Sequence, residues 1–284
     1  MNATPHPDDD PATTPGPAPS GERARVDPTV AHNARVWNHW LGGKDCYASD
    51  RAVGDHVASL FPSIVQVARA DRGFLRRAVR HLTAEAGMRQ FLDIGTGLPT
   101  SDNTHEVAQA AAPGSRIVYV DNDPMVLVHA EALLTSTPEG ATDYIEADAR
   151  DTRRVLAEAS RTLDFDRPVA LMMLGVLNFI EDDDEVAALV RRLVDALAPG
   201  SHVALSHPIV HTGEGGNAEA MAYWNENATP PITGRTPEQV AALLEGLTVL
   251  EPGVVSCSRW RPDVGDDGAQ PAWVAQVAAV ARKD

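Results

Sequence analysis

A regular alternation of short apolar strands and amphipathic helices, which begins after Gly87, constrains the fold of this chain more than any other feature. Short strands that alternate with helices are typical of a parallel sheet with helices on both faces. The pattern predicts strands over 90–94, 116–120, 143–147, 169–174 and 202–206. It predicts helices over about 102–112, 123–135, 155–163, 181–197 and 236–244. The fold class is therefore α/β, with an open doubly wound sheet.

Two β-rich runs close the chain, over 247–258 and 273–281. The segment between them contains Pro262, Gly265 and Gly268, which are typical turn residues. We therefore expect an antiparallel hairpin at the end of the sheet.

The first 20 residues hold 6 of the 21 prolines and no apolar periodicity, so residues 1–25 are predicted to form a disordered tail. Residues 26–86 precede the first strand and show helical spacing, including an amphipathic helix over 71–86. Residues 87–284 form the main domain, in which the Gly- and Asn-rich segment 209–235 interrupts the alternation. We expect residues 26–86 to form a helical cap and residues 209–235 to act as a lid.

Composition excludes several classes of protein. The formal net charge of −16 argues against nucleic-acid binding, which needs a basic surface. The longest mostly apolar run, 169–180, is shorter than the roughly 20 residues that span a bilayer, and the N-terminus lacks the pattern of a signal peptide. The two cysteines, Cys46 and Cys257, form no CxxC pair, which favours a reducing compartment. We expect a cytoplasmic protein that binds neither nucleic acid nor membrane.

Ligands of doubly wound sheets bind at the carboxyl ends of the strands, and three of these ends carry notable residues. The first strand runs into Asp93-Ile94-Gly95-Thr96-Gly97, where glycines allow a ligand to approach the backbone. The second ends in Asp121, whose carboxylate can accept hydrogen bonds from both ribose hydroxyls. The third is followed by Asp148 and Ala149, which can recognise an adenine edge. Each feature alone is commonly a tight turn or a helix cap, but their order on successive units favours a nucleoside-cofactor site.

The glycine turn distinguishes between nucleoside cofactors. The dinucleotide fingerprint G-x-G-x-x-G requires a third glycine, and Thr100 occupies that position. Asp93 lies two residues before Gly95, which suits a ligand with an ammonium group beside an adenosine, such as S-adenosylmethionine. The phosphate-binding loop G-x-x-x-x-G-K-[ST] does not occur in the sequence.

Several segments resemble known proteins. The stretches FLDIGTGLPT, VYVDNDP and EADARD, with the terminal hairpin, are similar to class I S-adenosylmethionine-dependent methyltransferases. More narrowly, ARVWNHWLGGKDCYASDR, ADRGFLRRAVRHL and RQFLDIGTGLPTSDNTHEVAQ resemble the bacterial family named S-adenosyl methyltransferase, first catalogued as a domain of unknown function. The resemblance covers about residues 30–282. It implies a Rossmann-like sheet of seven strands that binds S-adenosylmethionine and releases S-adenosylhomocysteine.

The resemblance also implies roles for individual residues. Asp93, Gly95 and Gly97 are expected to hold the methionine end of the cofactor, Asp121 and Asn122 the ribose, and Asp148 and Ala149 the adenine, while Leu174 to Asn178 form the floor of the transfer site. Two features depart from the family pattern. Trp37-Asn38-His39-Trp40 replaces a stretch richer in tyrosine, and Asn178 stands where a histidine is frequent.

The sequence identifies no definite catalytic residue. His39, His105, His207 and Asn178 are candidates near the expected mouth of the site, although each can equally serve packing or capping. Trp37, Trp40 and Trp224 either line an acceptor pocket or pack in the core or lid. The arginines at 72, 76 and 80 are interpreted as a solvated helix face. No metal site is predicted, because Pro208 disfavours the helix on which His207 and His211 would form a ligand pair.

Two functions remain open at this point. In the first, the protein is a methyltransferase that acts on a small-molecule acceptor beneath the cap. In the second, it binds S-adenosylmethionine or S-adenosylhomocysteine without transferring a methyl group, as a regulator or interaction protein. A dehydrogenase is a more distant alternative, because the third glycine is missing. The sequence contains no signal for the identity of the acceptor or for the oligomeric state.

Overall fold

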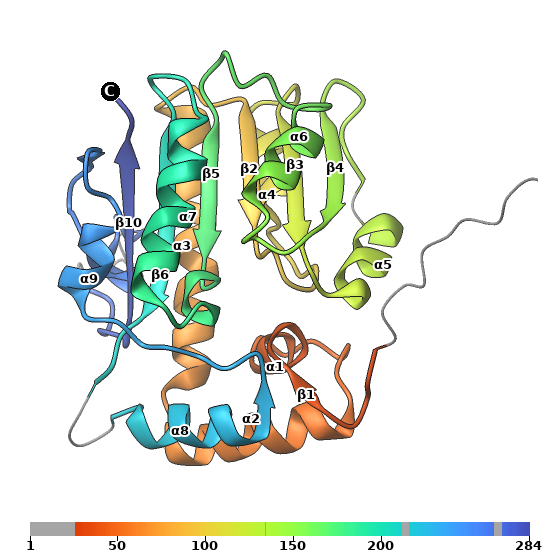
Figure 1. The fold of residues 1–284 in the computed structure, drawn as a ribbon, viewed down its shortest axis with the longest axis vertical. Helices are drawn as coiled ribbons and strands as arrows, with labels where there is room; N and C mark the ends of the chain where they lie inside the picture. The colour runs from red at the N-terminus through yellow and green to blue at the C-terminus, as the bar shows by residue number, and fades with distance from the viewer. Residues whose placement is uncertain (1–25, 134, 212–215, 264–268) are drawn as a thin grey trace, which may run out of the picture.

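The computed structural model describes residues 26–133, 135–211, 216–263 and 269–284. A mixed sheet forms its centre, with strand order β4-β3-β2-β5-β6-β10-β8 and with β9 pairing beside β8 on β10 (Figure 1). The predicted disordered tail, residues 1–25, lies outside the described residues, as do residues 212–215 of the predicted lid.

Five parallel strands form most of the sheet, and each lies within two residues of its predicted bounds. They are β2 (Gln90–Ile94), β3 (Arg116–Asp121), β4 (Ala141–Glu146), β5 (Ala170–Leu174) and β6 (His202–Pro208). The central strands β2 and β5 are buried along nearly their whole length, as is typical of parallel strands with helices on both faces. The carboxyl ends of these strands therefore meet at one edge of the sheet.

The C-terminal part of the chain adds antiparallel strands. Strand β10 (Gln276–Arg282) pairs with β6 on one side and with the short strands β8 (Thr248–Val249) and β9 (Val255–Ser256) on the other. The predicted seven-stranded sheet with an antiparallel C-terminal addition is confirmed. The run 247–258 forms two strands on either side of Pro252-Gly253, because Pro252 cannot donate to the ladder and Gly253 has a φ of 87°.

Helices cover both faces of the sheet. On one face α3 (Ile64–Ala84) contacts α4 (Thr104–Ala111), and on the other α6 (Thr152–Ala159) contacts α7 (Asp183–Asp195) (Figure 1). Helix α5 (Pro124–Leu133) packs beside β4, and α9 (Pro237–Ala242) begins at the capping box predicted at Thr236. Two short 3₁₀ turns follow β5 and β9, namely η1 (Leu177–Phe179) and η2 (Cys257–Arg259).

Helix α3 differs from its sequence prediction. It begins at Ile64 rather than near Asp71, so Asp71 lies inside the helix on its buried face. The predicted solvated arginine face agrees with the exposure of Arg76 and Arg80, whose side chains are 41% and 52% exposed, but the three arginines also bind other segments. Arg76 and Arg80 pair with Asp263 at 3.0 and 3.1 Å, and Arg72 donates to the backbone carbonyl of Ser101. These contacts join positions far apart in the sequence, which a local helical pattern does not reveal.

A layer of helices lies across the carboxyl ends of the parallel strands (Figure 1). It contains α1 (Asn33–Trp40), α2 (Ala48–Leu60) and α8 (Ala218–Asn227), and strand β1 (Ala31–His32) pairs in parallel with β7 (Ala228–Thr229). Trp40 of α1 approaches Trp224 of α8, with ring centroids 6.2 Å apart. The segments before β2 and after β6 therefore build one covering layer, which we call the cap.

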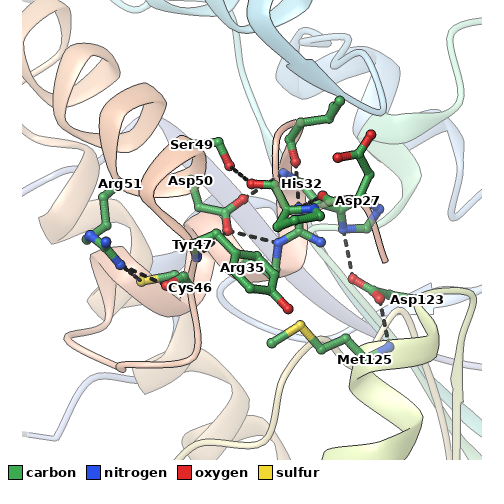
Figure 2. Close-up of polar contacts among 12 residues, drawn as sticks. Asp27, His32, Arg35, Cys46, Tyr47, Ser49, Asp50, Arg51, Asp123 and Met125 are labelled. Carbon is green, nitrogen blue, oxygen red and sulfur yellow. Dashed lines mark hydrogen bonds and ion pairs between the residues drawn. The ribbon is translucent and has the colours of Figure 1, made fainter. Parts of the chain in front are cut away.

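Polar contacts fix the N-terminal part of the cap (Figure 2). Asp50 is fully buried and accepts hydrogen bonds from Arg35 Nε at 2.9 Å and from the backbone N–H of His32 at 3.0 Å. His32 Nδ1 lies 3.0 Å from Asp123 Oδ2, and Asp123 Oδ1 accepts from the backbone N–H of Met125 at 2.9 Å. The cap is thus tied to the turn between β3 and α5.

In the described part of the chain, no helix combines the length and apolarity needed to cross a bilayer.

Candidate cofactor and acceptor site

A cavity of about 250 Å³ lies between the cap and the carboxyl ends of the strands. It has two sides, which we name for the roles that the sequence predicts. The ends of β2, β3 and β4 form the cofactor half. The cap, α3, the segment with η1 that follows β5, and the ends of β6 and β10 form the acceptor half. All eight residues predicted to bind the cofactor line the cavity: Asp93, Gly95, Gly97, Asp121, Asn122, Asp148, Ala149 and Leu174.

The glycine turn after β2 has a backbone that requires glycine. Gly95 and Gly97 have φ angles of 75° and 66°, which L side chains rarely adopt. A Cβ atom on Gly95 would lie 2.4 Å from Val176 Cγ2, whereas a Cβ on Gly97 would meet no atom within 4 Å. Gly95 therefore allows the turn to pack against the segment after β5. Gly97 leaves open space beside it.

Asp121 is held firmly at the end of β3. Its Oδ2 accepts from the backbone N–H of Gly97 at 2.8 Å, and its Oδ1 accepts from that of Asp123 at 3.0 Å. Burial raises the pKa of Asp121, and these two hydrogen bonds offset part of the rise. Each oxygen keeps a further lone pair, so the carboxylate can also accept hydrogen bonds from two hydroxyls of a ligand.

Asp93 is buried below the glycine turn. Its Oδ2 accepts from Thr104 Oγ1 at 2.6 Å. Burial raises the pKa of Asp93 to about 6, while the Thr104 hydrogen bond and the Arg72 charge act in the opposite direction. A positively charged ligand would favour the ionised form of this carboxyl. The two carboxylates thus fit an ammonium group near Asp93 and a ribose at Asp121, and S-adenosylmethionine contains both groups.

Asp148 and Ala149 lie at the outer edge of the cofactor half. Asp148 accepts from the backbone N–H of Arg150 at 2.8 Å and pairs with its guanidinium at 3.1 Å. Arg150 also donates to the backbone carbonyl of Phe179, which follows β5. These contacts connect the loop after β4 with the segment after β5, at the rim of the cavity.

Three tryptophans of the cap line the cavity: Trp37, Trp40 and Trp224. Trp40 and Trp224 are buried, and their Nε1 atoms donate to the backbone carbonyls of Gly54 at 3.1 Å and Pro230 at 2.9 Å. Trp37 is half-buried and meets Trp40 edge to face, with centroids 5.9 Å apart. The acceptor half therefore has a largely aromatic wall that is rigidly held.

Of the catalytic candidates from the sequence, Asn178 lines the cavity, and no histidine occurs among the described lining residues. His39 pairs with Asp55 at 2.9 Å. His207 Nδ1 lies 2.8 Å from the backbone carbonyl of Pro208 and Nε2 lies 2.9 Å from Arg235, so both ring nitrogens are engaged. Burial lowers the pKa of His207 to about 4.

The remaining histidine, His105, contacts the hydroxyl of Tyr119 at 2.9 Å through Nδ1. Sequence reasoning missed several polar residues that line the cavity, among them Asp71, Arg72 and Gln276. Asp71 lies three and four positions before Phe74 and Leu75 of the buried stripe. A carboxylate on an apolar helix face was therefore the signal in the sequence that could have identified it.

Within the described residues, no cluster of three or more His, Cys, Asp and Glu side chains could hold a metal ion.

The strand order, the acids at three successive strand ends and the cap define a Rossmann-like α/β protein of the class I methyltransferase type. The chain belongs to the S-adenosyl methyltransferase family, whose model matches residues 19–284. Membership in this family makes it a methyltransferase that depends on S-adenosylmethionine.

Two solved structures are similar to the chain along almost its whole length. A DUF574 family protein from Streptomyces avermitilis is 42% identical, with a TM-score of 0.87, over 92% of this chain and 100% of that chain. A candidate methyltransferase from Thermobifida fusca is 39% identical, with a TM-score of 0.82, over 90% of this chain and 96% of that chain. No curated protein matches the chain.

Proposed function

We propose that the protein transfers the methyl group of S-adenosylmethionine to a small molecule held beneath the cap. The observation that carries this proposal is the single cavity that all eight predicted cofactor residues share with three tryptophans of the cap. S-adenosylmethionine supplies an electrophilic methyl group on a sulfonium when it is bound. The contribution of the chain is to hold, orient and enclose the reactants.

The proposed roles follow from the contacts of each residue. Asp121, fixed by two backbone N–H groups, binds the ribose hydroxyls, and Asp93 favours the ammonium group. Gly97 leaves room for the cofactor along the turn. Asp148 and Ala149 at the rim receive the adenine.

A small acceptor suits the shape and charge of the site. The tryptophans line the cavity from the cap side, so a ligand lies between the cap and the strand ends, where a small molecule fits better than a macromolecular surface. The net charge of −16 also disfavours a polyanionic substrate. In this proposal the two parts of the cap come from the predicted helical cap, residues 26–86, and from the described part of the predicted lid, residues 209–211 and 216–235.

Calorimetric titration with S-adenosylhomocysteine tests the cofactor assignment. Asp121→Ala removes a charged hydrogen-bond acceptor from an enclosed site, which typically costs about 1–3 kcal/mol of binding free energy. We therefore expect the Kd to rise by about tenfold or more. Asp166→Ala is the matched control, since Asp166 is an exposed acid outside the cavity, and it should leave the Kd unchanged. An unaltered Kd for Asp121→Ala would remove Asp121 from the cofactor site.

A further inference from the structure

The acceptor half contains buried polar atoms that have no partner in the protein. Asp71 is 6% exposed and Asn178 is 2% exposed, and both line the cavity. Among the described residues, neither Asp71 Oδ1 nor Asn178 Oδ1 has a hydrogen-bond partner. Asn33 Oδ1, on α1 of the cap, is a third such atom on the same cavity, although Asn33 as a whole is half-buried. Leaving buried acceptors without partners is costly, so these atoms on one cavity indicate a ligand that supplies donors.

Asp71 belongs to the acceptor half rather than to the cofactor half. Helix α3, which carries Asp71, contacts β6 and β10, and Ser206 of β6 and Gln276 of β10 lower the pKa of its carboxyl group against the effect of burial. Strand β5 separates β6 and β10 from β2, β3 and β4, whose ends carry the proposed cofactor residues. Gln276 lines the cavity as well, and its Nε2 also donates to Ser206 Oγ at 3.2 Å. The unpartnered oxygen of Asp71 is therefore placed where the acceptor, and not the cofactor, is expected.

The charge of Asp71 is not balanced by an ion pair within the described residues. Arg72 is its neighbour in sequence, but that guanidinium donates to the backbone carbonyl of Ser101 and to Asn103 Oδ1. Burial raises the pKa of Asp71, and the hydrogen bonds with Ser206 and Gln276 offset only part of that effect. A buried carboxylate without a cation is costly, and a positively charged ligand relieves that cost.

The walls around Asp71 suit the rest of such a ligand. Trp37, Trp40 and Trp224 line the same cavity, together with Phe61 and Leu75. Aromatic faces attract cations as well as apolar groups, and the attraction is stronger where water is excluded. The site therefore combines one anionic group with an aromatic and aliphatic enclosure.

We propose that Asp71 binds the amino group of the methyl acceptor, which is an amine with an apolar or aromatic body, and that Asn178 accepts a second hydrogen bond from it. This inference rests on the proposed function. A protonated amine offers two or three N–H donors and a positive charge, so it satisfies the unpartnered oxygens of Asp71 and Asn178 and neutralises Asp71. Asp71 then accepts one proton of the bound ammonium, because the nitrogen needs a free lone pair to take the methyl group and release S-adenosylhomocysteine. A hydroxyl acceptor offers one donor and no charge, so it leaves one of the two oxygens unsatisfied.

Calorimetry at pH 8 on the S-adenosylhomocysteine-saturated protein tests the inference with 2-phenylethylamine and its neutral counterpart 2-phenylethanol. We expect the wild-type protein to bind the amine about tenfold or more tightly than the alcohol, the scale of one charge-assisted hydrogen bond. Asp71→Asn keeps the shape of the side chain and removes its charge. It should abolish the preference for the amine while the Kd of S-adenosylhomocysteine changes less than about twofold.

Controls separate this inference from folding and from the proposed function. Asp71→Asn should melt at the same temperature as the wild type or higher, because it removes an uncompensated buried carboxylate. Asp166→Asn should keep the amine preference. Failure of the wild-type protein to bind S-adenosylhomocysteine would refute the proposed function itself. If S-adenosylhomocysteine binds normally, any of three results would overturn the inference. The wild type shows no preference for the amine, it binds neither probe, or the preference persists in Asp71→Asn.

Discussion

The two halves of the cavity are built in opposite ways. In the cofactor half, Asp93, Asp121 and Asp148 each accept a hydrogen bond from the protein, and the glycine turn is fixed by its packing. In the acceptor half, Asp71 and Asn178 each retain a buried oxygen without a partner. The cofactor half is thus organised by the chain alone, whereas the acceptor half is completed by its ligand. Substitutions in the two halves should therefore affect stability and binding differently.

The largest effect is expected at the aromatic wall of the acceptor half, where a buried and a half-buried tryptophan can be compared. Trp40→Ala should lower the free energy of unfolding by about 3–5 kcal/mol, as large-to-small core substitutions do, because Trp40 is buried and hydrogen-bonded to Gly54. Trp37→Ala, at a half-buried position, should reduce ligand affinity more than stability. Urea denaturation and thermal melts with and without cofactor measure both. Equal destabilisation by the two substitutions, with a full response to ligand, would mean that Trp37 serves packing rather than the site.

A matched pair of glycine substitutions tests whether the cofactor half is fixed by packing. Gly95→Ala should cost about 3 kcal/mol of unfolding free energy, because the new methyl group collides with Val176 and the φ is positive. Gly97→Ala should cost about 1 kcal/mol for its φ alone, yet weaken S-adenosylhomocysteine binding by about tenfold or more. Denaturation curves and calorimetry on both variants provide the comparison. Similar stability losses for the two would contradict the packing argument.

The smallest expected effect is a pH dependence at Asp93. Because its pKa is raised to about 6 by burial, the carboxylate is mostly protonated at pH 5 and mostly ionised at pH 7. If the ionised form holds the ammonium group, the Kd of S-adenosylmethionine should rise by about tenfold from pH 7 to pH 5. Asp93→Asn should bind more weakly at pH 7 and lose most of this dependence. An identical pH profile for the variant and the wild type would exclude Asp93 from ammonium binding.

The same contrast explains how much the sequence could predict. Strands β2 to β6 were located within two residues, because each contains a local apolar run, and the cofactor half consists of the ends of three of them, β2, β3 and β4. The acceptor half gathers segments far apart in the chain, such as Trp40 with Trp224. Their proximity accompanies the parallel pairing of β1 with β7. Strands of two residues carry no recognisable pattern in the sequence.

Asp71 is a single residue that shows what the sequence could not predict. An acid at the start of a predicted helix is an ordinary favourable feature of a first turn, and the sequence placed Asp71 there. The helix actually begins at Ile64, so the same carboxyl group lies in its interior and faces the core of the site. A boundary error of seven residues was enough to conceal the most unusual polar group of the cavity.

The most direct test of the central claim is a crystal structure of the protein with S-adenosylhomocysteine. The account predicts that the ribose hydroxyls lie within hydrogen-bond distance of Asp121, that the amino group lies on the Asp93–Gly95 side of the turn, and that the acceptor half stays free beside Asp71. Density for the ligand outside the cavity, or a ribose without contact to Asp121, would contradict it.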